Sequence, residues 1–248
     1  MVSMGLEKLF FELASESRLG ILTELQKHDA KMPEIARKLD LTNTETFRQL
    51  QRLNEALLIE KRLDGSYGIS QNGKLLLEFS HSFEFVSRFG KCLLTRDLWR
   101  MPYQFINRLG ELSDASLSTD TNEMVNNAEA LISGAEKFLW LMGQRPLTSL
   151  GEKTNLISEK GISVKLIFDE ASRQFYEKMP QKTNVEKRVT PTIPAIMVIS
   201  EKYAGINLLS MDNRADNMIL YGMDPKILKW AHDLFFYYWE QGKRVYPT

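Results

Sequence analysis

Apolar residues near the start of the chain recur every three or four positions, which is the spacing of amphipathic helices. One such segment covers residues 4–14, and a second follows Ser15 or Ser17, either of which can cap its first turn. A third, short helix is expected to open at Pro33, because proline is favoured in a first helical turn. A turn over residues 40–43 follows, so the pattern predicts three helices in quick succession.

The next helix has a marked start, since Thr42 and Glu45 have the spacing of a capping box. Its apolar residues are predicted to share one face that packs on the domain: Phe47, Leu50, Leu53 and Leu57. Arg48 and Arg52 are expected on the opposite side. One packed side and one side able to contact phosphates and base edges is the geometry of a recognition helix.

A hairpin is predicted after this helix, because Asp64-Gly65 separates two short runs of alternating apolar residues, 58–63 and 66–70. Helices followed by a hairpin in this order predict a winged helix-turn-helix over residues 1–73. The candidate contacts to double-stranded DNA are Thr42, Asn43, Thr44, Thr46, Arg48, Gln49, Arg52, Lys61, Arg62 and Tyr67. A winged helix can also serve as a protein-interaction or ligand-binding module, and the pattern leaves that alternative open.

A long apolar-rich helix is expected over residues 74–95, after a turn at Asn72-Gly73. Part of it has heptad spacing, which would suit a linking helix that joins two copies in a homodimer: Leu76, Phe79, Phe83, Val86, Gly90 and Leu93. The same helix could instead pack on the chain's own second domain.

An α/β pattern fills residues 96–248. Strands are expected at 137–142, 162–168, 185–189, 196–200, 205–209 and 217–221, and helices at 124–132 and 147–158. Asp224-Pro225 predicts the start of a closing helix, and the polar residues 113–120 are interpreted as a loop. One sheet flanked by helices follows from this pattern.

Composition adds a constraint on the electrostatics. The chain has 248 residues, of which 43% are hydrophobic, and 32 Lys and Arg balance 32 Asp and Glu. Global charge therefore does not indicate nucleic-acid binding, although residues 31–62 carry seven cations against five anions. The single cysteine, the lack of a secretory signal and the lack of a long apolar stretch lead us to expect a cytoplasmic protein without a membrane segment.

Enzyme motifs are missing. None of the three histidines is followed two residues later by lysine, and the sequence has no G-x-S-x-G, P-loop or G-x-G-x-x-G motif. One cysteine and scattered histidines make a zinc site implausible. We therefore expect no enzyme, no metal and no cofactor.

A ligand site is still compatible with the polar residues that follow the predicted strands. The candidates for a small, anionic effector are Trp140, Arg145, Asp212 and Arg214. Each has an ordinary structural alternative, since a tryptophan inside a strand usually belongs to the core and loop arginines are often solvated.

Several segments resemble archaeal winged-helix transcription regulators of the methanogenesis-regulator type: "DLWRMPYQFINRLGELSDA", "EKFLWLMG", "EKGISVKLIFDE" and "DPKILKWAHDLFFYYWEQG". The second domain is also similar to that of sugar-sensing archaeal regulators. The resemblance implies a DNA-binding regulator with a C-terminal α/β sensor domain, whose phospholipase-D-like sheet is non-catalytic.

Overall fold

The structure is a computed structural model that describes residues 5–144, 160–177 and 183–245. The chain divides into two units, Met1–His81 and Ser82–Thr248. Each unit is described by itself below. The helix predicted over 147–158 lies outside the described residues.

The first unit contains the predicted helices and hairpin. It begins with α1 (Leu6–Leu13), α2 (Glu16–Lys27), α3 (Met32–Lys38) and α4 (Asn43–Glu55), and continues with strands β1 (Ile59–Lys61) and β2 (Tyr67–Ile69). Ser15 caps α2, where its side chain accepts a hydrogen bond from the Arg18 amide. The two strands pair antiparallel, and Gly65 supplies the positive φ of +82° in the turn between them. The winged helix-turn-helix is confirmed.

The core of this unit is aliphatic. Residues from α2, α3, α4 and the hairpin meet in it, and its fully buried members are Ile21, Leu22, Leu25, Ile35, Leu50, Leu53 and Ile59. Because α3 and α4 contribute to one core, the turn between them holds α4 at a defined angle against the rest of the unit.

A buried polar network fastens α1 and α2 to α4. Arg18 donates from Nη1 to Oε1 of Gln49 at 2.9 Å, and its Nε lies 3.1 Å from Oε2 of Glu12. It also donates to the main-chain oxygens of Phe11 and Glu12. Arg18, Glu12 and Gln49 are all at most 5% exposed. A buried charge needs such complete pairing, so this network fixes which side of α4 faces inward.

Helix α5 (Gln71–Leu93) begins earlier than predicted. Asn72 and Gly73 lie in its first turn and not in a separate turn, because the Ser70 hydroxyl accepts from the Gly73 amide at 3.0 Å and caps the helix. One side of α5 is buried, through Leu77 in the core of the first unit and through Phe85 and Phe89 in the core of the second.

The second unit is built on a mixed sheet flanked by helices, so the predicted fold class is confirmed. Its strands are β3 (Ser116–Ser118), β4 (Phe138–Gly143), β5 (Ser163–Asp169), β6 (Val185–Thr190), β7 (Ala195–Ser200), β8 (Ala204–Leu208), β9 (Ile219–Gly222) and β10 (Lys243–Arg244). Its helical elements are η1 (Leu98–Arg100), α6 (Tyr103–Ile106), η2 (Leu109–Leu112), α7 (Thr121–Gly134), η3 (Glu170–Ser172), α9 (Arg173–Glu177) and α10 (Pro225–Gln241).

Among the described residues the sheet has the order β10-β6-β5-β4-β7-β8-β9-β3. Strands β4, β5 and β6 are parallel, and the other pairs are antiparallel. Strand β3 lies inside the polar stretch 113–120, so the interpretation of that stretch as a loop is wrong. The three residues of β3 lack the alternation of apolar and polar residues that predicts a strand. They are extended because they pair with β9.

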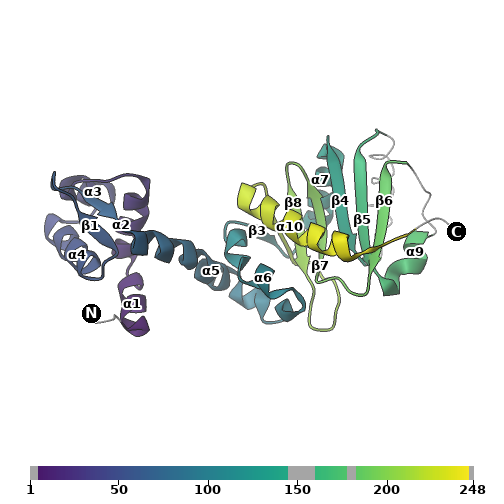
Figure 1. The fold of residues 1–248 in the computed structure, drawn as a ribbon, viewed down its shortest axis with the longest axis horizontal. Coiled ribbons are helices and arrows are strands. Elements are labelled where there is room, and N and C mark those ends of the chain that lie inside the picture. Colours follow the sequence, from purple (N-terminus) through teal and green to yellow (C-terminus); the bar gives the residue numbers. More distant parts are fainter. Residues whose placement is uncertain (1–4, 145–159, 178–182, 246–248) are drawn as a thin grey trace. The chain divides into compact units, whose positions relative to one another are not determined.

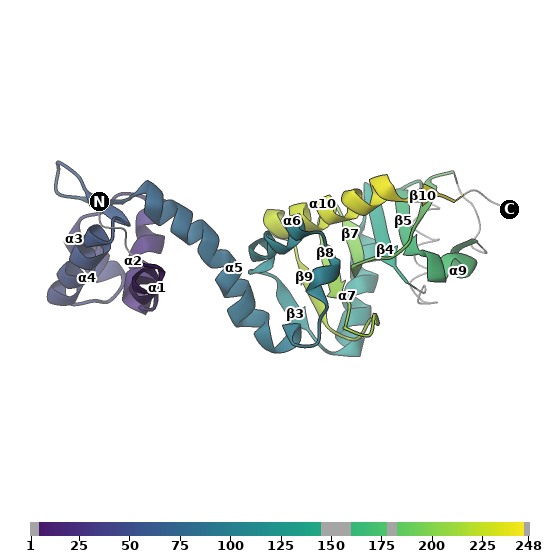
Figure 2. The same ribbon diagram turned by 60° about the horizontal axis from the view of Figure 1, so that its bottom comes forward.

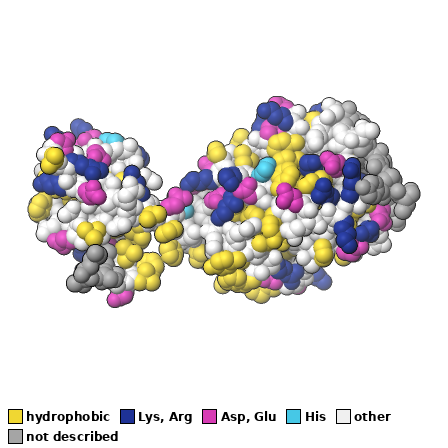
Figure 3. Space-filling view, in the orientation of Figure 1, with side chains coloured by type: hydrophobic (Ala, Val, Ile, Leu, Met, Phe, Trp, Pro, Cys, Tyr) yellow, Lys and Arg dark blue, Asp and Glu magenta, His cyan; other side chains and the backbone are white. Residues whose placement is uncertain are grey.

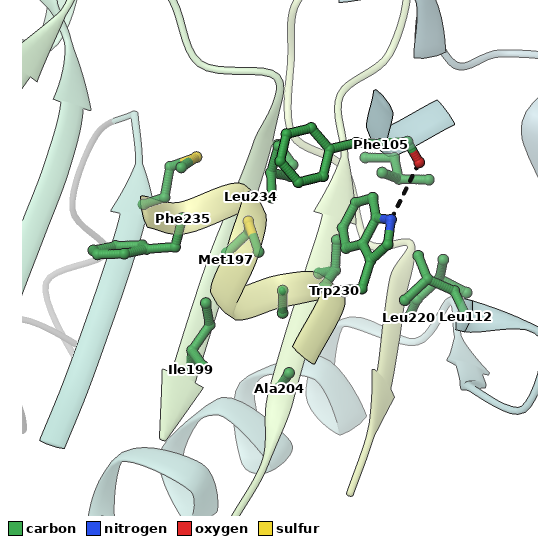
Figure 4. Packing of buried hydrophobic residues seen from close by; sticks show 14 of the residues in the cluster. Phe105, Leu112, Met197, Ile199, Ala204, Leu220, Trp230, Leu234 and Phe235 are labelled. Carbon is green, nitrogen blue, oxygen red and sulfur yellow. Dashed lines mark hydrogen bonds between the residues drawn. The ribbon is translucent and has the colours of Figure 1, made fainter. Parts of the chain in front are cut away.

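Helix α10 covers one face of the sheet together with α6 and η2, and α7 lies on the other face (Figures 1 and 2). Asp224 caps α10, accepting from the Lys226 amide at 2.8 Å, as the sequence predicted. Figure 4 shows the large apolar core beneath α10, where Trp230 is fully buried and donates from Nε1 to the main-chain oxygen of Phe105 at 3.2 Å. The aromatic closing helix is thus a core helix.

Candidate nucleic-acid interface

The exposed side of α4 carries mostly polar residues. Asn43, Thr44, Phe47, Arg48, Gln51, Asn54 and Glu55 are exposed, whereas Thr46, Gln49, Leu50 and Leu53 are buried. Thr42 caps the helix, and its hydroxyl accepts from the Glu45 amide at 3.2 Å. Only this half of the predicted capping box forms. The Glu45 carboxylate instead accepts from Arg48 and Gln49.

The helix is rotated relative to the prediction. Phe47 and Leu57 were expected in the packed face, but they are 56% and 67% exposed. Thr46 and Gln49, predicted as DNA contacts, are buried: Thr46 donates to the Thr42 carbonyl at 2.9 Å, and Gln49 accepts from Arg18. These polar residues satisfy their hydrogen bonds inside the unit, so periodicity counted on apolar residues alone misjudged the inward side.

Arg48 is the predicted cation that is best displayed on α4. Its side chain is 68% exposed and pairs with Glu45 at 2.6 Å, three residues earlier. Exposed pairs of this kind contribute only about 0.2–1 kcal/mol. The guanidinium can therefore leave Glu45 for a phosphate at little cost.

Arg52 is committed within the unit. It donates from Nε and Nη2 to the two oxygens of the buried Glu12 carboxylate, at 3.1 and 2.7 Å, and its guanidinium lies 5.1 Å from the centre of the Phe11 ring. The hydrogen bond to Glu12 raises the pKa of Arg52 above its ordinary value. A bidentate pair of this type is the strong form of the interaction, so Arg52 fastens α1 to α4.

The wing presents a similar division. Arg62 donates to Asp29 and to Glu60, each at 2.8 Å, and the bond to Asp29 raises the pKa of Arg62. Lys61 is exposed, lies 5.8 Å from the centre of the Tyr67 ring and forms no ion pair within the described part of the chain. Lys61 is therefore the better phosphate ligand of the two. Tyr67 itself is half-buried, and its backbone pairs with Ala30.

A surface hollow of about 660 Å³ lies between the wing and the start of α3. Three acidic residues, Asp29, Glu34 and Asp64, outnumber its two cations, Lys31 and Arg62. Its net negative charge would repel a phosphate, so the charges of the first unit favour phosphate contact through α4 and Lys61.

The structure describes three of the four effector candidates. Trp140 is 8% exposed and stacks on Phe138 and Phe235, with ring centroids 3.9 and 5.4 Å apart, so it belongs to the core and is not the wall of an open pocket. Asp212 and Arg214 pair at 3.5 Å on an exposed turn, where the Ser210 hydroxyl lowers the pKa of Asp212. Arg145 lies outside the described residues.

The second unit has other hollows that the sequence did not predict. A groove of about 450 Å³ is lined by Phe138, Ile199, Ser200, Glu201, Leu228, Lys229, His232 and Asp233. In Figure 3, hydrophobic side chains lie at the surface along α10 beside a histidine. A smaller hollow of about 230 Å³ lies beside α7 and includes Asn127, Lys202 and Tyr203. Helical spacing hid the groove, because a residue such as Leu228 at its edge has the same periodicity as the core residues of α10.

In the described part of the chain, no group of three or more His, Cys, Asp or Glu residues is arranged to hold a metal ion. A membrane-spanning helix was not found among the same residues either.

The family model described as "Methanogenesis regulatory protein FilR1, middle domain" matches residues 147–241. This segment is therefore similar to the middle domain of that regulator. The resemblance to methanogenesis regulators predicted from the sequence is confirmed there, within the second unit. The match covers less than half of the chain and does not include α4 or the wing.

The solved structures that match have low TM-scores and low sequence identity. The archaeal chromatin protein TrmBL2 has a TM-score of 0.45 and 11% identity, over 93% of this chain and 94% of its own. Nuc from Salmonella typhimurium, a phospholipase D family member, has a TM-score of 0.41 and 12% identity, over 54% and 100% of the two chains. An IclR transcriptional regulator from Alicyclobacillus acidocaldarius has a TM-score of 0.29 and 11% identity, over 94% and 96%. No curated protein matches the sequence.

Proposed function

We propose that this protein is a transcription regulator that binds double-stranded DNA through α4 and the wing, and that its second unit has a sensory and not a catalytic role. The observation that carries the proposal is the exposed side of α4. This helix is capped, follows a short helix and a turn, lies next to a hairpin, and presents Thr44, Arg48 and Gln51 outward. The match of residues 147–241 to the FilR1 middle-domain model supports a regulatory role.

The electrostatics imply binding of moderate strength. Arg52 and Arg62 are held by carboxylates within the unit. Arg48 has only an exposed pair with Glu45, and Lys61 forms no ion pair within the described part of the chain, so we assign these two as the main phosphate ligands of α4 and the wing. Each phosphate neutralised contributes about 0.9 to the slope of log affinity against log salt. The slope should therefore be shallow compared with that of strongly basic repressors.

A salt titration tests this assignment. Duplexes that the full chain selects from a random library serve as the DNA. Fluorescence anisotropy then gives the affinity of the wild type, Arg48→Ala and Lys61→Ala for these duplexes at several salt concentrations. Each substitution removes one phosphate ligand, so it should weaken binding and reduce the slope by about 1. Arg173→Ala is the charge-matched control, because Arg173 lies in the second unit and pairs with Glu170 and Glu177. No duplex binding at low salt, or slopes equal to that of the control, would contradict the proposal.

We also propose that the regulator is a homodimer joined along α5. Opposite the buried side of this helix, four large apolar residues are between 55% and 62% exposed: Leu75, Phe79, Phe83 and Val86. They recur with spacings of four, four and three residues. Gly90 follows four residues later, and a Cβ added there would meet no atom within 4 Å outside its own stretch of helix. A stripe of this kind fits a second copy of the same helix. In this proposal the dimer uses the exposed stripe. Leu76 and Leu93 of the predicted seam pack instead against the cores of the first and second unit, respectively.

Sedimentation equilibrium tests the dimer. Phe79→Glu should shift the wild-type dimer to monomer, because it would bury a charge in the apolar seam. Asn72→Asp adds the same charge at an exposed position in the first turn of α5 and should leave the dimer intact. A monomeric wild type at micromolar concentration would refute the dimer.

The effector site that we propose is the groove beside α10. Its lining includes the apolar Phe138 and Leu228 together with the polar residues Lys229, His232, Glu201 and Asp233. Lys229 is paired with Asp233 at 2.6 Å, so the charges favour a neutral effector as much as an anionic one. A compound that raises the Tm of the wild type should not do so for Leu228→Trp, which fills the groove. Equal stabilisation of both proteins would exclude this site.

A protein-interaction role for the winged helix is the alternative. The exposed Phe47 and Leu57 favour it, since apolar residues are enriched in the centres of protein interfaces. A partner protein whose binding survives both Arg48→Ala and Lys61→Ala, in a chain that binds no duplex, would support this second function.

A further inference from the structure

Phe47 is a large apolar side chain in the middle of the polar side of α4. It is 56% exposed, whereas Leu50 and Leu53 on the same helix are fully buried. A single exposed apolar residue is common on protein surfaces. Phe47, however, lies on the outward side of the helix that we assign to DNA contact, so it bears on which bases are recognised.

The outward direction of Phe47 is imposed by its neighbours in sequence. Gln49 must face inward to accept from the buried Arg18, and Thr46 faces inward to bond the Thr42 carbonyl. With residues 46, 49, 50 and 53 inside, position 47 falls outside the buried arc of a helix with 3.6 residues per turn, in agreement with its exposure. The protein thus holds two polar residues inside and a phenyl ring outside.

The residues beside Phe47 are suited to base edges. Thr44 lies three residues before it and Gln51 four residues after it, so the three side chains are neighbours along one line of the helix surface. Gln51 donates to Glu55 at 3.1 Å in an exposed pair that it can give up. Arg48 flanks this line as the phosphate ligand.

A phenyl ring, a threonine methyl group and a glutamine amide side by side match the groups that A·T base pairs present in the major groove. Thymine presents a C5-methyl group there, which phenylalanine and the threonine methyl contact, and adenine presents N6 and N7, which a glutamine amide binds with two hydrogen bonds. Guanine, in contrast, is read by arginine or lysine. We infer that Phe47 and Gln51 read adjacent A·T base pairs in each half-site, with Phe47 packed on a thymine methyl group. The inference rests on the proposed DNA binding and adds the base class that is recognised.

Replacement of thymine by deoxyuridine removes only the methyl group and tests the inference directly. Each thymine of a duplex selected by the full chain is replaced in turn, and anisotropy gives the affinity of the wild type, Phe47→Ala, Phe47→Leu and Arg48→Ala. One replacement per half-site should weaken wild-type binding about fourfold, the factor that burial of one methyl-sized group contributes. Phe47→Ala should bind more weakly and no longer distinguish the two bases at that position.

The other variants separate the roles. Phe47→Leu keeps an apolar side chain and should retain the preference for thymine, and Arg48→Ala should retain it at lower overall affinity. Circular dichroism checks that Phe47→Ala folds, which its exposure leads us to expect. Wild-type binding that is indifferent to every deoxyuridine, or a preference that persists in Phe47→Ala, overturns the inference while DNA binding stands. Absence of binding to any duplex overturns the proposed function and this inference with it.

Discussion

Replacing Glu12 with alanine should destabilise the first unit more than any exposed substitution. Glu12 is 4% exposed. Its carboxylate pairs with Arg18, which is 5% exposed, and accepts hydrogen bonds from Nε and Nη2 of Arg52. Removal of one partner from a buried ion pair costs about 3–5 kcal/mol. Arg18 keeps its bonds to Gln49 and to two main-chain oxygens, so the cost should lie near the lower end of that range. Loss of the partly exposed Arg52 pair adds at most about 1 kcal/mol.

The chain offers a convenient way to measure this. Its tryptophans are Trp99, Trp140, Trp230 and Trp239, which all belong to the second unit, so their fluorescence reports on that unit alone, whereas far-ultraviolet circular dichroism reports on both. Urea unfolding of Glu12→Ala should shift the early part of the dichroism transition to lower urea and leave the tryptophan transition as an internal reference.

Glu55→Ala is the matched control. It removes the same charge from an exposed position of α4 and should change the free energy of unfolding by less than about 0.5 kcal/mol. A Glu12→Ala protein as stable as this control, or one in which only the tryptophan transition moves, would refute the assignment of Glu12 as the residue that holds α1 on α4.

Two further predictions concern the same unit. A Cβ at Gly73 would lie 2.2 Å from the carbonyl oxygen of Leu58, so Gly73→Ala should lower the free energy of unfolding by about 3 kcal/mol, as measured by circular dichroism. The neighbouring substitution Asn72→Ala, at an exposed position, should be nearly neutral, and equal losses of stability would contradict the contact. The hydrogen bond from Lys38 lowers the pKa of Glu24, so Glu24 stabilises the fold above its unfolded pKa of about 4.3, and this contribution is lost as pH falls through the folded pKa. Glu24→Gln should therefore lose less stability than the wild type on acidification below about pH 4.5, and parallel pH curves would argue against this ion pair.

Local patterns predicted most of the secondary structure because its causes are local. Ser15, Thr42 and Asp224 cap their helices within three residues of themselves, and the turn at Asp64-Gly65 joins two neighbouring strands. Runs of apolar residues located strands β4 to β9 for the same reason. Strand β3 escaped because the strand it pairs with, β9, lies about a hundred residues later in the chain.

The candidate site was less predictable because it depends on which side of a helix is buried. The choice of Arg48 over Arg52 follows from the pairing of Arg52 with Glu12, a residue on another helix, whereas Arg48 pairs with Glu45 of its own helix. In the second unit, Trp140 was a candidate for an open pocket until packing against Phe138 and Phe235 enclosed it.

The sequence by itself determined a winged helix-turn-helix followed by a long helix and an α/β domain, since capping residues, turn residues and apolar periodicity act over a few positions. Tertiary structure alone decided the rotation of α4. Arg18 needs acceptors where water cannot reach it, and Glu12 and Gln49 supply them only with Thr46 inside and Phe47 outside. A buried charge is costly unless it is fully paired, and for that reason polar contacts between distant residues, and not apolar spacing, set the surface that α4 presents.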